Sequence, residues 1–239
     1  EGQRSEAARC RHTFPDQGSD AETVLDVVHI DLCGPFRVAA NDGSFYFLLL
    51  KDRRTRYVWV TPIVKKSDAL VVFEKWLKLG ILHNLKCPCT PQQNRMAERE
   101  MHTVVETVRT MLLHMGVKHH WWHLALRQAV WVRNCLERAS LPSGTAPHEL
   151  LFEKKPDLTL ARVRGFMVQF MVPEQQRGGK LAPKARWGLH LGVSPESKGW
   201  EVLKLTDNKV VTTVEAIFYK TMSLEAWKEE HDPISMRKL

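Results

Sequence analysis

The sequence is short of cysteine and of long apolar runs, and both shortages limit what the protein can be. Its five cysteines are scattered and odd in number, which gives no disulfide framework and favours a reducing compartment. The longest apolar runs, such as FYFLLL from Phe45, fall far below the ~20 residues that a membrane-spanning helix needs. No signal-peptide pattern occurs near Glu1. We therefore expect a nuclear or cytoplasmic protein with no membrane partner.

Acidic residues are also too few to balance the basic ones. The 239 residues carry a net charge of +8, while 44% hydrophobic and 26% charged residues are ordinary globular values. An excess of this size favours an anionic partner, most commonly nucleic acid, although a merely basic, soluble surface gives the same composition. The length permits one large domain or two smaller ones.

The first part of the chain has the pattern of a mixed α/β domain. After a polar leader, three β-type runs separated by short polar turns predict an antiparallel meander, the first run ending near Asp31. Four helical patterns follow, and in the second of them five apolar residues recur at helical spacing. The predicted strands cover 23–33, 45–52 and 57–64; the predicted helices cover 67–80, a segment beginning at 95, 118–138 and 146–155; the stripe is Met101, Val104, Val105, Val108 and Met111.

The pattern changes after Pro156 to short β-type runs joined by turn residues, which predicts a small all-β barrel or sandwich. We place the boundary near 157–162. The predicted organisation is a polar leader at 1–22, a core with a helical extension at 23–157, a small β-barrel at 158–220 and a polar tail at 221–239.

Two carboxylates stand where a metal-dependent phosphoryl-transfer enzyme would place them. Asp31 ends a strand and Glu98 lies in the first turn of a helix, and two-metal catalysis requires carboxylates from different elements. The alternative is structural, because Asp commonly caps turns and Glu is favoured in a first helical turn by the helix dipole. Spacing alone favours this structural reading.

Several segments, in the same order, resemble the integrase of copia-type retrotransposons: HIDLCGPF, YFLLLKDRRTRYVWV, TPQQNRMAERE, KKPDLTLARVRGF and PKARWGLHLGVSPESKGWEVL. The resemblance runs from about residue 10 to about residue 219. It implies a ribonuclease H-like core, here a truncated mixed sheet flanked by helices, followed by an SH3-like barrel. It also implies DNA strand transfer with two magnesium or manganese ions held by an Asp–Asp–Glu triad.

Carried onto this chain, the first Asp of the triad is Asp31 and the Glu is Glu98, both as metal ligands. Asp52 matches the second acid of the family's Asp-Asp pair, which is outside the triad, and Lys51 occupies the position of the first. The second triad Asp normally follows the first helix on a further strand, but here the helix at 67–80 leads directly into LGILHNLKCPCTPQQN. One strand and one helix are therefore missing.

This loss predicts a defective enzyme. The other acids between Asp31 and Glu98 are in a turn, a strand end and the first helix, namely Asp42, Asp52, Asp68 and Glu74. Two carboxylates would hold two cations poorly, so strand transfer should be severely impaired. The missing strand would also leave the edge of the first strand open, unless 85–89 moves in to pair with it.

Other candidate residues follow from the charge and from the resemblance. We expect nucleic-acid contacts from Gln93, Asn94, Arg95, Arg99, Lys184 and Arg186. The C-terminal module is basic through Arg162, Arg164, Lys180, Lys184 and Arg186, which fits phosphate contact and equally fits an ordinary solvated surface. Cys87 and Cys89 of the CPC segment have no second Cys/His pair at zinc spacing, so we expect structural cysteines rather than a zinc site. Cys10 and His12 in the leader cannot hold zinc on their own. His119, His120 and His123 beside Trp121 and Trp122 would suit a metal or stacking role. The resemblance implies a packing aromatic here, so we expect a core anchor at the start of this helix.

The prediction is an integrase-derived protein that binds DNA, both element ends and target, and has lost its catalysis. Homo-oligomers are a family expectation. Two alternatives remain open: a fragment of a functional integrase with a gap in the gene model, and a repurposed module that binds only proteins.

Overall fold

The structure is a computed structural model and describes residues 23–78, 95–142, 144–179, 181–194 and 197–231. The predicted meander is confirmed: β1 (Val28–Cys33), β2 (Tyr46–Asp52) and β3 (Val58–Ile63) form an antiparallel sheet in the order β1-β2-β3. The expectation of a mixed sheet is not met, because every ladder between the described strands is antiparallel. The segment 85–89, expected to pair with the first strand, lies outside the described residues.

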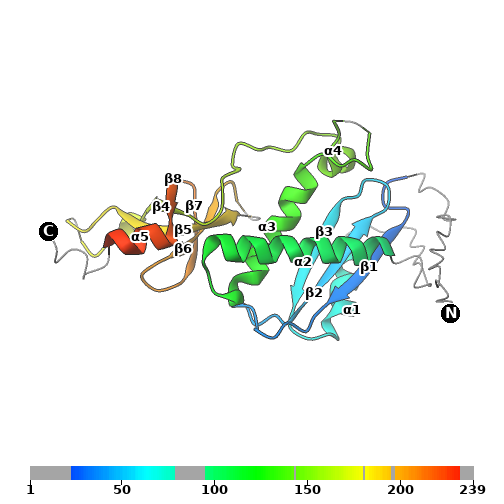
Figure 1. The fold of residues 1–239 in the computed structure, drawn as a ribbon, viewed down its shortest axis with the longest axis horizontal. Coiled ribbons are helices and arrows are strands. Elements are labelled where there is room, and N and C mark those ends of the chain that lie inside the picture. The colour runs from blue at the N-terminus through cyan, green and yellow to red at the C-terminus, as the bar shows by residue number, and fades with distance from the viewer. Residues whose placement is uncertain (1–22, 79–94, 143, 180, 195–196, 232–239) are drawn as a thin grey trace, which may run out of the picture.

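Alternation along the strands gives this sheet two different faces. One face carries Val28, Leu48 and Leu50 and is covered by α1 (Asp68–Lys78). The opposite face carries Phe47 and Leu49 and is covered by two helices, α2 (Arg95–Met115) and α3 (Trp122–Cys135), as Figure 1 shows. The short helices η1 (His119–Trp121) and α4 (Pro147–Phe152) flank α3 in the chain.

The apolar stripe predicted on α2 packs as expected. Met101, Val104 and Val108 are buried, and Val105 and Met111 pack half-buried against the same cluster. Trp121 and Trp122 are buried at the start of α3, where Trp122 stacks on Phe36 with ring centroids 4.5 Å apart. This confirms the expectation of an aromatic anchor at the start of that helix.

The C-terminal part is a second antiparallel sheet in the order β7-β6-β5-β4-β8. Its elements are β4 (Phe166–Met171), η2 (Glu174–Gln176), β5 (Ala185–Val193), β6 (Trp200–Lys204), β7 (Val210–Thr213) and β8 (Ala216–Ser223). The chain does not become a polar tail after residue 220. It continues β8 and then forms α5 (Leu224–His231), because Leu224 is buried and Trp227 packs against the main cluster.

One apolar cluster joins the two sheets. It includes Leu126 of α3 together with Met167, Leu189 and Leu203 of the second sheet. Polar contacts reinforce the junction: Arg127 forms an ion pair with Glu201 at 2.8 Å. The C-terminal sheet is therefore packed against α3 rather than attached only by the chain connection. No described helix has the length and apolar character needed to cross a membrane.

A buried histidine lies at this junction. His190 on β5 has no exposed surface, and its Nδ1 lies 3.0 Å from the carbonyl oxygen of Val163. Burial, assisted by the positive charge of Arg164, lowers the pKa of His190 to about 4. In the unfolded chain an ordinary histidine binds a proton near pH 6.5.

We therefore expect the free energy of unfolding to decrease as the pH falls from about 6.5 to about 4, because the unfolded chain takes up this proton first. The contribution of His190 amounts to roughly 3 kcal/mol at the acid end. Urea unfolding across this pH range should show a flatter profile for His190→Leu than for the wild type. The exposed His102 supplies the control, and a His102→Leu profile as flat as that of His190→Leu would contradict the assignment.

Candidate functional site

Asp31 lies on the sheet face that α2 covers. It pairs with Leu49 across the β1–β2 ladder, and Leu49 belongs to the cluster beneath α2 and α3. Its carboxylate is half-buried and accepts a hydrogen bond from the backbone N–H of Leu32 at 2.8 Å. The alternation of β1 thus directs this acid toward α2 rather than toward α1.

Glu98 approaches Asp31 from the first turn of α2. Burial, and then the negative charge of Glu98, raise the pKa of Asp31 above its usual value, although the hydrogen bond from Leu32 opposes them. Glu98 itself is exposed to solvent. The structure therefore brings together the two acids that the sequence pattern selects, and they repel each other.

No third ligand joins this pair within the described part of the chain. There, no group of three or more His, Cys, Asp or Glu side chains is arranged to hold a metal ion. The residues between α1 and α2 that the structure does not describe, 79–94, contain neither Asp nor Glu. Among the described residues, the α2 side of the sheet therefore presents Asp31 and Glu98 without a third His, Cys, Asp or Glu arranged with them to hold a metal ion.

The four other acids between Asp31 and Glu98 have different positions. Asp52 pairs with Val28 and therefore points to the α1 face; its carboxylate accepts hydrogen bonds from Leu25 and Thr55. The carboxylates of Asp42 and Asp68 accept hydrogen bonds from backbone N–H groups close in sequence. Glu74 is exposed on α1. These acids have structural or surface roles.

A buried charge cluster, which we call the Glu100 cluster, lies on the same face as Asp31. The Glu100 carboxylate of α2 pairs with Lys51 of β2 at 2.7 Å, with Arg133 at 2.5 Å and with Arg138 at 2.9 Å. The side chains of Glu100 and Lys51 are only 4% and 8% exposed. Three cations therefore surround one anion and tie α2 to β2 and α3.

The electrostatics of this cluster follow from its composition. Burial alone would raise the pKa of Glu100, but hydrogen bonds from Arg138, Arg133 and Lys51 outweigh burial and lower it to about 2. Stability from this carboxylate is thus present above about pH 4.5 and is lost as the pH falls toward 2. The sequence reasoning missed Glu100, yet Lys51 directly after three leucines in a strand was a signal that a buried cation needed an anion.

Replacing Glu100 should be strongly destabilising. Glu100→Gln leaves three cations without their anion, which should cost about 3–5 kcal/mol in the free energy of unfolding. The matched control is Glu106→Gln on the same helix, where the exposed pair with Arg109 should be worth less than about 1 kcal/mol.

Urea unfolding followed by circular dichroism measures both variants. The double variant Lys51→Met with Glu100→Met should recover part of the loss, because it removes the closest buried cation with the anion. Equal unfolding midpoints for Glu100→Gln and Glu106→Gln would contradict the role given to the Glu100 cluster.

The residues expected to contact nucleic acid fall into two separate groups. Arg95 and Arg99 are exposed in the first turns of α2, while Lys184 and Arg186 are exposed at the start of β5. Figure 1 shows that α2 begins over the first sheet, whereas β5 belongs to the second sheet at the other end of the described molecule. Gln93 and Asn94 lie outside the described residues.

Two other arginines of the basic C-terminal module, Arg164 and Arg162, have different surroundings. Arg164 is buried, only 6% exposed, and donates to the Leu124 carbonyl oxygen at 3.2 Å, so its expected contact with phosphate is wrong. Burial lowers the pKa of this guanidinium to about 9. Arg162 is exposed and its guanidinium lies over the Trp200 ring. Lys180 and the cysteine and histidine candidates Cys10, His12, Cys87 and Cys89 lie outside the described residues.

Comparisons with known proteins find similarity to retrovirus-related polyproteins. Residues 167–232 match the family model described as the retroviral polymerase SH3-like domain. The Retrovirus-related Pol polyprotein from transposon TNT 1-94 of Nicotiana tabacum is 26% identical over 87% of this chain and 18% of its own length. The polyprotein from transposon RE1 of Arabidopsis thaliana is 25% identical over 72% of this chain and 14% of its own.

This chain is related to the integrase region of LTR-retrotransposon Pol polyproteins. The integrase-related chain spans less than a fifth of the length of these two relatives. A cryo-EM structure of the simian T-cell lymphotropic virus intasome in complex with PP2A regulatory subunit B56 gamma has 13% identity and a TM-score of 0.40. It covers 80% of this chain and 76% of that chain. The β4–β8 sheet and α5 thus form the SH3-like part of the integrase-related chain.

Proposed function

We propose that the integrase-related chain binds DNA through a copia-type integrase scaffold whose metal-dependent strand transfer is lost. The observation that supports the catalytic part is the pair Asp31 and Glu98, with no third carboxylate beside it in the described part of the chain. The proposed scaffold is a ribonuclease H-like core, truncated by one strand and one helix, with the SH3-like part attached through α3.

The loss of activity follows from charge and coordination. Two divalent cations that bridge a phosphate need several carboxylates, and their ligands must be held within a fraction of an ångström. Here Asp31 is held by β1 while Glu98 is exposed on α2, and the missing acid has no replacement within 79–94. Removal of one ligand therefore leaves the Asp31–Glu98 pair as a remnant of the site.

The proposed DNA binding depends on exposed cations. The chain has a net charge of +8, and Arg95 and Arg99 lie at the start of α2, where the helix dipole adds positive potential. Lys184 and Arg186 give the second sheet its own exposed cations. A DNA molecule that contacts both groups would run along α2, which is about 30 Å long. Binding of element ends and target as a homo-oligomer is part of this proposal.

Binding to a labelled DNA duplex, measured by fluorescence anisotropy at several salt concentrations, tests the proposal. The affinity should fall steeply with salt, and the slope should decrease by about one for each phosphate contact removed. We expect this decrease for Arg95→Ser, Arg99→Ser and Lys184→Ser. Lys65→Ser with Lys66→Ser is the matched control, because these exposed lysines precede α1, which covers the other face of the sheet.

Equal slopes for the wild type and the α2 and β5 variants would contradict the assigned interface. Failure of the wild type to bind a duplex at low salt would contradict the whole proposal and would favour a module that binds only proteins.

A further inference from the structure

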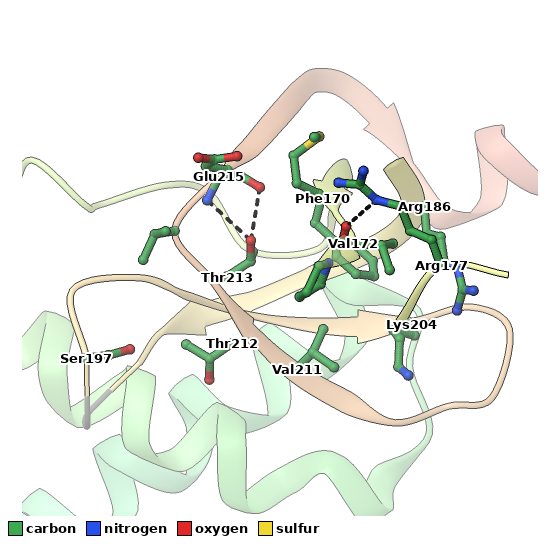
Figure 2. A pocket seen from close by; sticks show the side chains of 13 residues that line it. Phe170, Val172, Arg177, Arg186, Ser197, Lys204, Val211, Thr212, Thr213 and Glu215 are labelled. Carbon is green, nitrogen blue, oxygen red and sulfur yellow. Dashed lines mark hydrogen bonds between the residues drawn. The ribbon is translucent and has the colours of Figure 1, made fainter. Parts of the chain in front are cut away.

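The SH3-like part contains a cavity that is separate from the Asp31–Glu98 pair and from the Glu100 cluster. Its volume is about 630 Å³, and its lining residues come from the second sheet and its connections, not from β1, which carries Asp31, or α2, which carries Glu98. Figure 2 shows Phe170, Val172 and Val211 near its centre. The Thr213 hydroxyl is hydrogen-bonded to the Glu215 backbone, so the cavity combines an apolar floor with a wall fixed by these bonds.

The charges around this cavity are unevenly distributed. Figure 2 shows Arg177, Arg186 and Lys204 on one side and Glu215 on the opposite side. Arg177 is held in place because its Nε donates to the Val172 carbonyl oxygen at 2.8 Å, which leaves the rest of its guanidinium available. Lys204 pairs with Asp207 at 2.9 Å, whereas Arg186 is exposed and has no acidic partner within the described ranges. One wall thus offers a site for an anion.

We infer that this cavity binds an unpaired nucleotide of a single-stranded nucleic acid. The inference rests on the proposed function and specifies a second kind of nucleic-acid contact. A volume of this size suits a small organic group. An unpaired nucleotide brings one flat, largely apolar base and one phosphate, which match the apolar floor and the cationic wall.

A duplex fits this cavity less well than a single strand does. In a duplex the bases are stacked inside and the phosphates lie on a convex outer surface. A base of a duplex therefore cannot enter this cavity unless it first leaves the stack. An acidic peptide with an aliphatic side chain is the competing occupant. The repeated phosphates and the +8 charge of the whole chain favour nucleic acid.

The test uses the full chain with two labelled probes, a dT oligonucleotide and a hairpin duplex, in anisotropy titrations. Val214 lines the cavity and is 64% exposed, so Val214→Glu should place a carboxylate there that repels a phosphate. We expect Val214→Glu to weaken dT binding about tenfold while duplex binding changes less than about twofold. Arg177→Ser is a second variant with the same expected preference, and thermal melting verifies that both variants are folded.

Lys209→Ser is the control, since this exposed lysine precedes β7 and does not line the cavity. It should affect both probes equally. If the wild type binds duplex but not dT, or if Val214→Glu and Arg177→Ser weaken both probes alike, the inference is wrong while the proposed function stands. If neither probe binds, both are wrong. If the wild type binds a peptide of alternating Glu and Val but not dT, and Arg177→Ser weakens binding of that peptide, the cavity is assigned to peptides and the inference is wrong.

Discussion

The two-residue alternation of the β1–β2 ladder is the constraint on which the rest of the structure depends. It places Asp31 and Lys51 on the face that α2 covers, and it turns Asp52 toward α1. The start of α2 packs on this face and carries two acids, Glu98 and Glu100, that differ in burial. Glu98 lies near Asp31 and remains exposed, while Glu100 is buried among cations.

The Glu100 cluster gives a physical reason why this face of the sheet is stable. Lys51 is buried there and needs an anion, which Glu100 provides at 2.7 Å. The same contact anchors the helix that presents Glu98. An unmatched pair of acids near the surface is tolerated, because Asp31 can bind a proton more readily and Glu98 is solvated. The sheet face therefore accommodates both the buried Glu100 cluster and the Asp31–Glu98 pair.

Local patterns predicted most of the fold because they report burial directly. The three-stranded meander, the α2 stripe and the β-rich C-terminal part follow from apolar periodicity. The roles that were missed arise from contacts between residues distant in sequence. They are the ion pair of Glu100 with Arg133, the hydrogen bond from Arg164 to the Leu124 carbonyl oxygen, and the packing of Trp227 against the main cluster. The cavity of the SH3-like part was also missed. Arg177 after η2, Arg186 of β5 and Lys204 of β6 line one cavity only once the chain is folded.

Asp31 and Glu98 show the same limit at the candidate site. Their positions on a strand and in the first turn of a helix were predictable, and the sequence itself shows that 79–94 contains neither Asp nor Glu. Their approach and mutual repulsion required coordinates. The measurement that tests the account most directly is strand joining of a terminal DNA duplex by the purified chain with Mg²⁺ or Mn²⁺, with Asp31→Asn as the background. The account predicts no joining above that background; metal-dependent joining that Asp31→Asn abolishes would contradict it.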